Sequence, residues 1–409
     1  MHQRDSPGRF HALDGLRGIA ALVVVVHHTL LTSPALALPY LDPHQPLTGA
    51  ARWLVYSPLH LLWAGGEAVL VFFVLSGFVL TLPFLRPGAG PAAWTGYFPK
   101  RLARLYLPVL AAVALAAGWA LLVPRSTAAG ASWWLNAHDV PLTARAAADD
   151  AGLILRHGPG MLNGPLWSLR WEVFFSLLLP VYVWAAPRVR PLAGVAGLLA
   201  TVAVGSATGH PTLVYLPIFG LGAILAVHHD RLHQLTRRWW RSAAVPAAAA
   251  ALALLLARWW APAGRGATGA TGGLLDAATA LGAALVVVCF LCLPGVRRGA
   301  ERPAVQWLGK RSFSLYLVHE PIVVSLALLL GPRWQGAPLL VVALPASLLA
   351  AHLFYLAVEA PAHRFARWLE WLARLRAPLP ALAAAAPAPT LASIAADSPA
   401  VVGKERPAA

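Results

Sequence analysis

Residues 61–85 read LLWAGGEAVLVFFVLSGFVLTLPFL. This stretch holds one ionisable residue, Glu67, and exceeds the roughly 20 apolar residues that a helix needs to cross a bilayer. Similar stretches recur along the chain at approximately 15–34, 102–123, 166–186, 191–207, 211–228, 242–260, 273–293, 312–331 and 337–358. The sequence therefore predicts an all-α polytopic membrane protein of about ten transmembrane helices.

The composition supports this interpretation and excludes a soluble fold. Of the 409 residues, 58% are hydrophobic and 12% are charged, whereas a soluble domain carries about 25% charged residues. A net charge of +16 could indicate a nucleic-acid partner, but the basic residues form short clusters between apolar stretches, so we expect none. Two cysteines exclude a disulfide scaffold.

The basic clusters also predict the topology. If ten spans alternate in direction, most of the 32 Lys and Arg residues face one side of the membrane. Positive loops stay in the cytoplasm, so both termini are expected inside. Two long outer loops, 35–60 and 124–165, either cap a cavity or simply connect helices. Residues 1–370 form the predicted membrane domain, and the Ala/Pro-rich tail 371–409 is expected to be a disordered cytoplasmic segment.

Ionisable side chains within the first apolar stretch are the first functional signal, because such groups are costly in a membrane. Arg17 and His28 are eleven residues apart, which places them on one helix face about 16 Å apart along the axis. Arg17 is then expected at the cytoplasmic mouth and His28 near mid-membrane. Asp14 is expected to cap the helix start, and His27 to point away from this face.

Other apolar stretches add polar groups at comparable depth. Ser312, Tyr316 and His319 follow i, i+4, i+7 spacing and share a helix face. Trp167, Ser168 and Glu172 lie in the fourth stretch, and Ser76 lies in the second. A buried carboxylate needs a partner, so we expect Glu172 to pair with one of the histidines. Together, His28, Ser76, Glu172 and His319 predict a site.

A basic cluster, Lys100-Arg101-Leu102-Ala103-Arg104, is expected to open the third helix. Such a cluster can simply set the topology. Alternatively, Arg101 and Arg104 lie on one helix face and suit phosphate groups. The chain shows no zinc-protease motif, phosphate-binding glycine loop or nucleophile elbow, so we expect no bound cofactor and no metal.

Six motifs in order resemble the acyltransferase-3 family of bacterial membrane acyltransferases. They are LDGLRGIAAL (13–22) with His28, FFVLSGF (72–78), KRLARLYLP (100–108), LWSLRWEVFFSLLLP (166–180), SFSLYLVHEP (312–321) and VEAPAHRFARW (358–368). The resemblance covers about residues 10–370. It implies a ten-helix core in the bacterial plasma membrane. It also implies acyl-CoA, with acetyl-CoA expected, as the cytoplasmic co-substrate, and a carbohydrate or glycosylated acceptor on the outer side.

The resemblance also implies roles for particular residues. The family's arginine and histidine of the first helix fall on Arg17 and His28, its R-x-x-R on Arg101 and Arg104, and its fourth-helix glutamate on Glu172. Where relatives often have Asp before FFVLSGF, this chain has Glu67. The expected mechanism uses His28 as general base, Glu172 to orient it, and His319 with Tyr316 to polarise the thioester or protonate the thiolate; Asp14, Ser76, Trp167 and Ser168 are supporting residues.

Several alternatives remain open from the sequence. The acyl group could be longer than acetyl, the oligomeric state is open, and transfer could be direct or pass through an acylated residue. The rival function is a proton-coupled transporter that uses the His/Glu cluster as a relay, since buried ionisable groups fit both functions.

Overall fold

The structure is a computed structural model that describes residues 10–86, 91–154, 162–261 and 266–375. Within these ranges it is helical and contains no strand. Eight helical segments are long and apolar enough to cross a membrane, and two shorter apolar ones, Pro191–Ala207 and Ala243–Leu255, add to them. The predicted all-α polytopic fold is therefore confirmed.

The long helices match most of the predicted spans. They are α1 (His11–Leu31), α4 (Gly65–Thr81), α5 (Pro91–Leu122), α8 (Leu166–Ala185), α9 (Pro191–Ala207), α10 (Pro211–Leu255), α12 (Gly269–Cys292), α14 (Pro303–Leu330), α15 (Leu340–Phe354) and α16 (Ala360–Leu375). The short helices are α2 (Pro34–Leu41), α3 (Gly49–Tyr56), α6 (Trp133–Asn136), α7 (Ala144–Gly152), α11 (Ala257–Trp260) and α13 (Pro294–Ala300).

Two predicted boundaries are wrong. The expected connector at 229–241 is helical, so that the spans predicted at 211–228 and 242–260 belong largely to one continuous helix, α10. The third helix begins at Pro91 rather than at the basic cluster, and it continues through Pro99. Residues 1–9 and 376–409, on which the predictions for the termini rest, lie outside the described residues. Of the predicted tail 371–409, residues 371–375 are described and belong to the helix α16.

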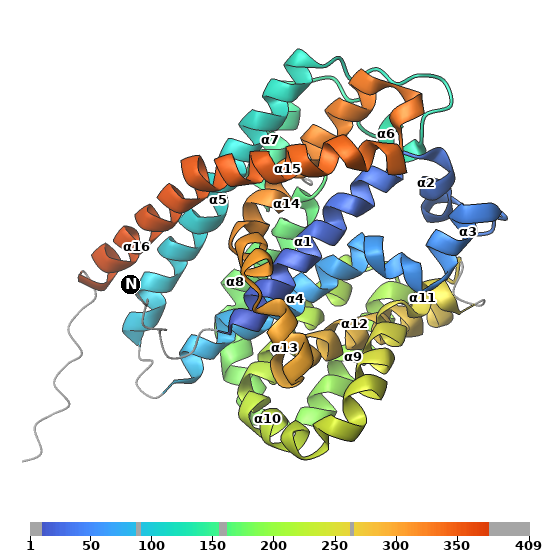
Figure 1. Cartoon of the computed structure of the whole chain (residues 1–409). Helices are drawn as coiled ribbons and strands as arrows, with labels where there is room; N and C mark the ends of the chain where they lie inside the picture. The colour runs from blue at the N-terminus through green and yellow to red at the C-terminus, as the bar shows by residue number, and fades with distance from the viewer. Residues whose placement is uncertain (1–9, 87–90, 155–161, 262–265, 376–409) are drawn as a thin grey trace, which may run out of the picture.

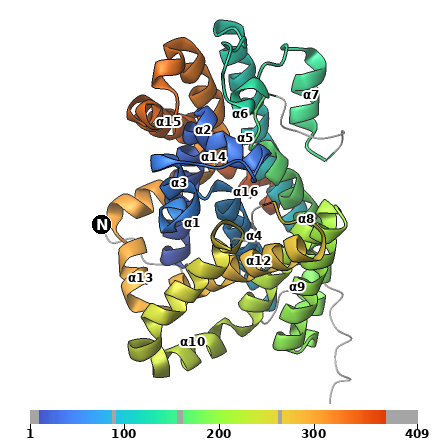
Figure 2. The same ribbon diagram turned by 90° about the vertical axis from the view of Figure 1, so that its right-hand side faces the viewer.

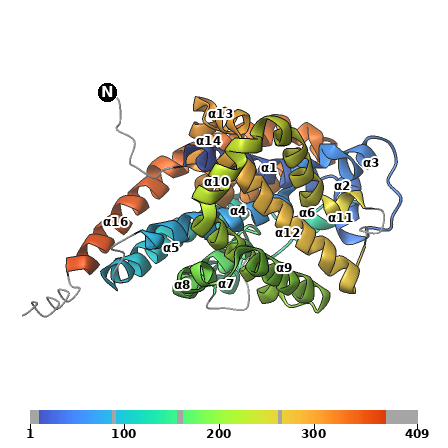
Figure 3. The ribbon, with the colours of Figure 1, turned by 90° about the horizontal axis from the view of Figure 1, so that it is seen from below.

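The bundle has two distinct ends. At one end, α5 and α16 run side by side and project from the other helices, and we call it the basic end after Arg17, Arg101 and Arg104 (Figure 1). At the opposite end, which we call the loop end, α2, α3 and α11 gather (Figure 3). Helix α6 lies beside α2 at the loop end (Figure 2). By the distribution of positive charge, the basic end is the predicted cytoplasmic end.

Glycines set a close helix crossing between α1 and α14. A Cβ on Gly309 of α14 would lie 2.2 Å from the Asp14 carbonyl oxygen, and one on Gly18 would lie 2.5 Å from the Gly309 nitrogen. Neither position tolerates a side chain, so the two backbones touch. A second close approach lies at Gly77 of α4, because a Cβ there would lie 2.0 Å from the Phe219 carbonyl oxygen of α10.

Candidate active site

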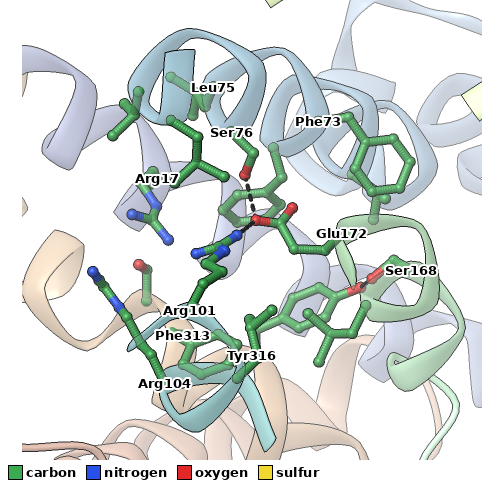
Figure 4. A pocket seen from close by; sticks show the side chains of 17 residues that line it. Arg17, Phe73, Leu75, Ser76, Arg101, Arg104, Ser168, Glu172, Phe313 and Tyr316 are labelled. Carbon is green, nitrogen blue, oxygen red and sulfur yellow. Dashed lines mark hydrogen bonds and ion pairs between the residues drawn. The ribbon is translucent and has the colours of Figure 1, made fainter. Parts of the chain in front are cut away.

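A cavity of about 120 Å³ opens among α1, α4, α5, α8 and α14 near the basic end (Figure 4). Arg17 lines it from α1, and Arg101 and Arg104 line it from α5. Each of the three guanidinium groups carries a fixed positive charge and presents several N–H donors. The structure thus brings three arginines from two separate stretches of the sequence to one cavity.

The remaining walls of this basic cavity are mostly apolar. Phe72, Phe73 and Leu75 of α4, Leu169 of α8 and Phe313 of α14 contribute to them. A cavity with cations at one side and hydrocarbon around the rest suits a ligand that has an anionic portion and an apolar portion.

Glu172 lies inside the basic cavity and not beside a histidine. Its carboxylate forms an ion pair with Arg101 and accepts a hydrogen bond from Ser76 Oγ at 2.9 Å. Arg101 Nε also donates to Ser176 Oγ at 3.0 Å. The prediction that Glu172 pairs with a histidine is therefore wrong. The physical reason is the packing of α5 against α8, which brings the Arg101 guanidinium to Glu172.

Tyr316 and Ser168 form the other side of the cavity. Their hydroxyl oxygens are 2.7 Å apart, and both side chains are buried (Figure 4). Tyr316 Oη also donates to the Pro165 carbonyl oxygen at 3.2 Å. Trp167, one residue before Ser168, packs instead against Phe73 and Tyr215. Tyr316 thus marks the boundary between the cavity and the next turn of α14.

His28 and His319 meet on that next turn. His28 Nδ1 lies 2.9 Å from His319 Nε2, and the two rings stack with centroids 5.1 Å apart. The Tyr316 and His319 rings are 6.0 Å apart, so the histidine pair lies one helical turn beyond the cavity wall. The sequence predicted these two histidines for one site, and the structure places them in contact.

Glu320 supplies the carboxylate that the sequence assigned to Glu172. Its Oε2 lies 3.1 Å from His28 Nδ1, and its Oε1 accepts from His138 Nε2 at 3.0 Å and from the Gly164 amide at 2.5 Å. The Glu320 side chain is 2% exposed. A carboxylate that is buried this deeply is stable only with several donors, and these contacts provide them.

The hydrogen bonds define the tautomers of the histidine pair. His319 Nδ1 lies 3.0 Å from the Leu315 carbonyl, which can only accept, so this nitrogen carries the proton. The lone pair of neutral His319 is then on Nε2 and accepts from His28 Nδ1. Consequently, His28 Nε2 carries a lone pair and is the basic nitrogen of the pair.

His27 lies beside this cluster, with its ring 5.3 Å from the His28 ring, but its hydrogen bond goes elsewhere. His27 Nδ1 donates to the Trp63 carbonyl at 2.8 Å on another side of α1, as its 100° offset predicts. The N-cap of α1 is Phe10 and not Asp14, which lies in the first turn, so the predicted capping role is wrong.

Two residues of the site were missed by sequence reasoning. Glu320 directly follows His319 in an apolar stretch and was itself a signal, because any ionisable residue there needs a partner. Helical spacing alone does not place it beside His319, because successive helical residues point about 100° apart. His319 and Glu320 can face one site only when the site's other groups approach α14 from more than one direction. His138 lies in the outer loop 124–165, where no periodicity points to it.

Comparison with known families gives one match. The family model Acyl_transf_3, described as an acyltransferase domain, matches residues 10–356. No curated protein and no solved structure matches significantly. The matched segment contains the basic cavity, the histidine pair and Glu320. The chain is therefore a membrane acyltransferase that belongs to the acyltransferase-3 family.

Proposed function

We propose that this acyltransferase moves an acyl group, acetyl being the expected one, from cytoplasmic acyl-CoA to a hydroxyl of a carbohydrate or glycosylated acceptor. One observation carries the proposal. A cavity lined by three arginines ends at Tyr316, and the His28–His319 pair lies one helical turn farther along α14. A donor with an anionic portion and a reactive end suits this arrangement.

The donor would bind through its phosphates at the basic cavity. Arg17 and Arg104 supply guanidinium groups that suit phosphate oxygens. Arg101 is already paired with Glu172, so the carboxylate offsets one of the three positive charges and leaves the cavity cationic. The acyl group would then extend past Phe72 toward Tyr316 and the histidines.

The transfer step uses the basic nitrogen of His28. The acceptor hydroxyl gives its proton to His28 Nε2 while its oxygen forms a bond to the thioester carbonyl carbon, and the carbon–sulfur bond breaks to release the CoA thiolate. The proton on His28 returns to that thiolate. His319 and Glu320 hold His28 Nδ1 and stabilise the imidazolium form during the step. An acyl-enzyme is the alternative route.

The transporter alternative has less support. The family match assigns an acyltransferase domain. A proton relay would explain the histidines but not a cluster of three arginines around an apolar cavity, whereas donor binding explains both.

The test is CoA release from acetyl-CoA by detergent-purified protein. We expect His28→Ala to lower the rate by about 10²–10⁴-fold, the usual contribution of a general base, while the protein stays folded. His210→Ala is the control, since His210 is exposed at a helix start away from the site. If wild type neither releases CoA nor binds it, the donor assignment fails. If mass spectrometry detects an acylated protein after incubation with donor alone, direct transfer is refuted.

A further inference from the structure

We propose that His138, in the segment that follows α6, is a positioning residue: a buried imidazolium that holds Glu320 and cancels much of its charge, so that His28 stays neutral and basic. The inference rests on the proposed function, because it concerns the same histidine pair.

The hydrogen bonds of His138 require both of its nitrogens to donate. Nδ1 lies 2.8 Å from the Trp134 carbonyl oxygen, and Nε2 lies 3.0 Å from Glu320 Oε1. A carbonyl and a carboxylate oxygen both accept, and neutral imidazole carries only one N–H. With Glu320 ionised, both contacts are satisfied only by the imidazolium form. The His138 side chain is 11% exposed, so the pair is shielded from water.

The segment around His138 is fixed on three sides. Trp133 Nε1 donates to the Ala37 carbonyl of α2 at 2.6 Å. Trp134 stacks on the His28 ring with centroids 5.3 Å apart. His138 reaches Glu320 of α14. These contacts define where the imidazolium sits relative to His28, so the loop forms part of the site and is not only a connector.

The charge on His138 matters because of the position of Glu320. Glu320 Oε2 is 3.1 Å from His28 Nδ1. An uncompensated carboxylate at that distance favours the protonated form of a histidine, and a protonated His28 cannot act as a base. His138 opposes this in two ways: it offsets the carboxylate, and it is itself a like charge near His28.

Other titratable or charged groups face the same cluster. His27 on α1 and His319 on α14 interact with His28, and Arg125, after α5, interacts with Glu320. Burial lowers the pKa of Arg125, while the Glu320 carboxylate opposes that shift. These groups are the same in every variant considered below, so a change in the pH profile reports on His138 and Glu320.

The experiment measures the pH dependence of acetyl-CoA turnover between about pH 5 and 9, where histidine titrates. In His138→Gln, which keeps a donor but loses the charge, Glu320 favours the protonated form of His28. The acid limb of the profile should then move up by about one pH unit. At a fixed pH on the acid limb the turnover rate should therefore fall about tenfold, and it should recover at alkaline pH.

Two further variants identify the charge as the cause. His138→Lys retains a cation, so its acid limb should stay near that of wild type. In His138→Gln/Glu320→Gln the carboxylate is also removed, so the limb should return to or below the wild-type position. If His138→Gln does not fold, His138→Asn serves as the neutral variant instead, and its acid limb should move up in the same way relative to His138→Lys.

The outcomes separate this inference from the proposed function. An active wild type whose His138→Gln variant loses rate equally at all pH values would overturn the imidazolium role and leave the acyltransferase assignment intact. An inactive wild type would refute the donor assignment instead.

Discussion

The basic cavity and the histidine cluster are both built on α1 and α14, but they use their polar groups differently. In the cavity, Arg17 and Arg104 line open volume. In the cluster, His28, His319 and Glu320 contact one another and form a closed set of hydrogen bonds. Cations around open space suit a ligand that brings its own anions. A closed set of partners suits groups whose orientation must be fixed before a reaction.

The largest expected effect tests the pairing inside the cavity. Arg101→Ala would leave the Glu172 carboxylate buried without its ion-pair partner, because both side chains are 12% exposed. Breaking such a pair costs about 3–5 kcal/mol. We expect a corresponding loss in the free energy of unfolding, measured in detergent.

The double variant Arg101→Ala/Glu172→Gln should recover much of that stability, because the unpaired charge is gone. The control is Arg297→Ala on α13, whose pair with Glu301 is 43% and 37% exposed and should contribute less than about 1 kcal/mol. A double variant as unstable as Arg101→Ala would show that the ion pair is not the cause.

A smaller effect is expected where the two regions are joined. Gly309→Ala would place a Cβ 2.2 Å from the Asp14 carbonyl oxygen, so α1 and α14 must separate. Overpacking of this kind costs about 1–3 kcal/mol, and the separation should pull His28 from His319. We expect lower thermal stability together with slower CoA release.

Gly118→Ala is the matched control for Gly309→Ala. Nothing lies within 4 Å of a Cβ at Gly118 in α5. Alanine there should be neutral or stabilise the helix by up to about 1 kcal/mol. Equal thermal stability and equal CoA release in the two variants would contradict the tight crossing of α1 and α14.

The same two regions show how far sequence reasoning reaches. The fold and the shared helix face of Arg101 and Arg104 could be predicted because apolar length, positive clusters and helical spacing are local properties of the chain. The carboxylate partner of His28 could not be predicted, because the choice between Glu172 and Glu320 depends on how α5, α8 and α14 pack. The spacing of Arg101 and Arg104 shows which face of α5 they share but not which helix that face meets, and it is the packing of α5 against α8 that brings Arg101 to Glu172.

Arg104→Ala should affect donor binding and not chemistry. Removing one guanidinium from the basic cavity should raise the KM for acetyl-CoA about tenfold, the worth of roughly one charge-assisted hydrogen bond, with kcat little changed. Added salt should narrow the difference in KM between the variant and wild type. The control is Arg145→Ala on α7, where the side chain is 82% exposed. A lower kcat at unchanged KM would place Arg104 in the chemical step instead.

The smallest effect concerns the boundary between the two regions. Tyr316→Phe and Ser168→Ala each remove the hydrogen bond between hydroxyl oxygens 2.7 Å apart. A neutral hydrogen bond contributes about 0.5–1.5 kcal/mol, so we expect a loss in turnover of about two- to tenfold in each variant, with the donor KM unchanged. Because both substitutions remove the same bond, the double variant should be no slower than either single one.

Tyr182→Phe is the control. Tyr182 lies away from the cavity and donates to the Leu216 carbonyl oxygen at 3.0 Å, so its substitution should alter stability alone. If the losses of Tyr316→Phe and Ser168→Ala multiply, the two hydroxyls act separately, and the boundary between donor cavity and histidine cluster does not depend on their contact.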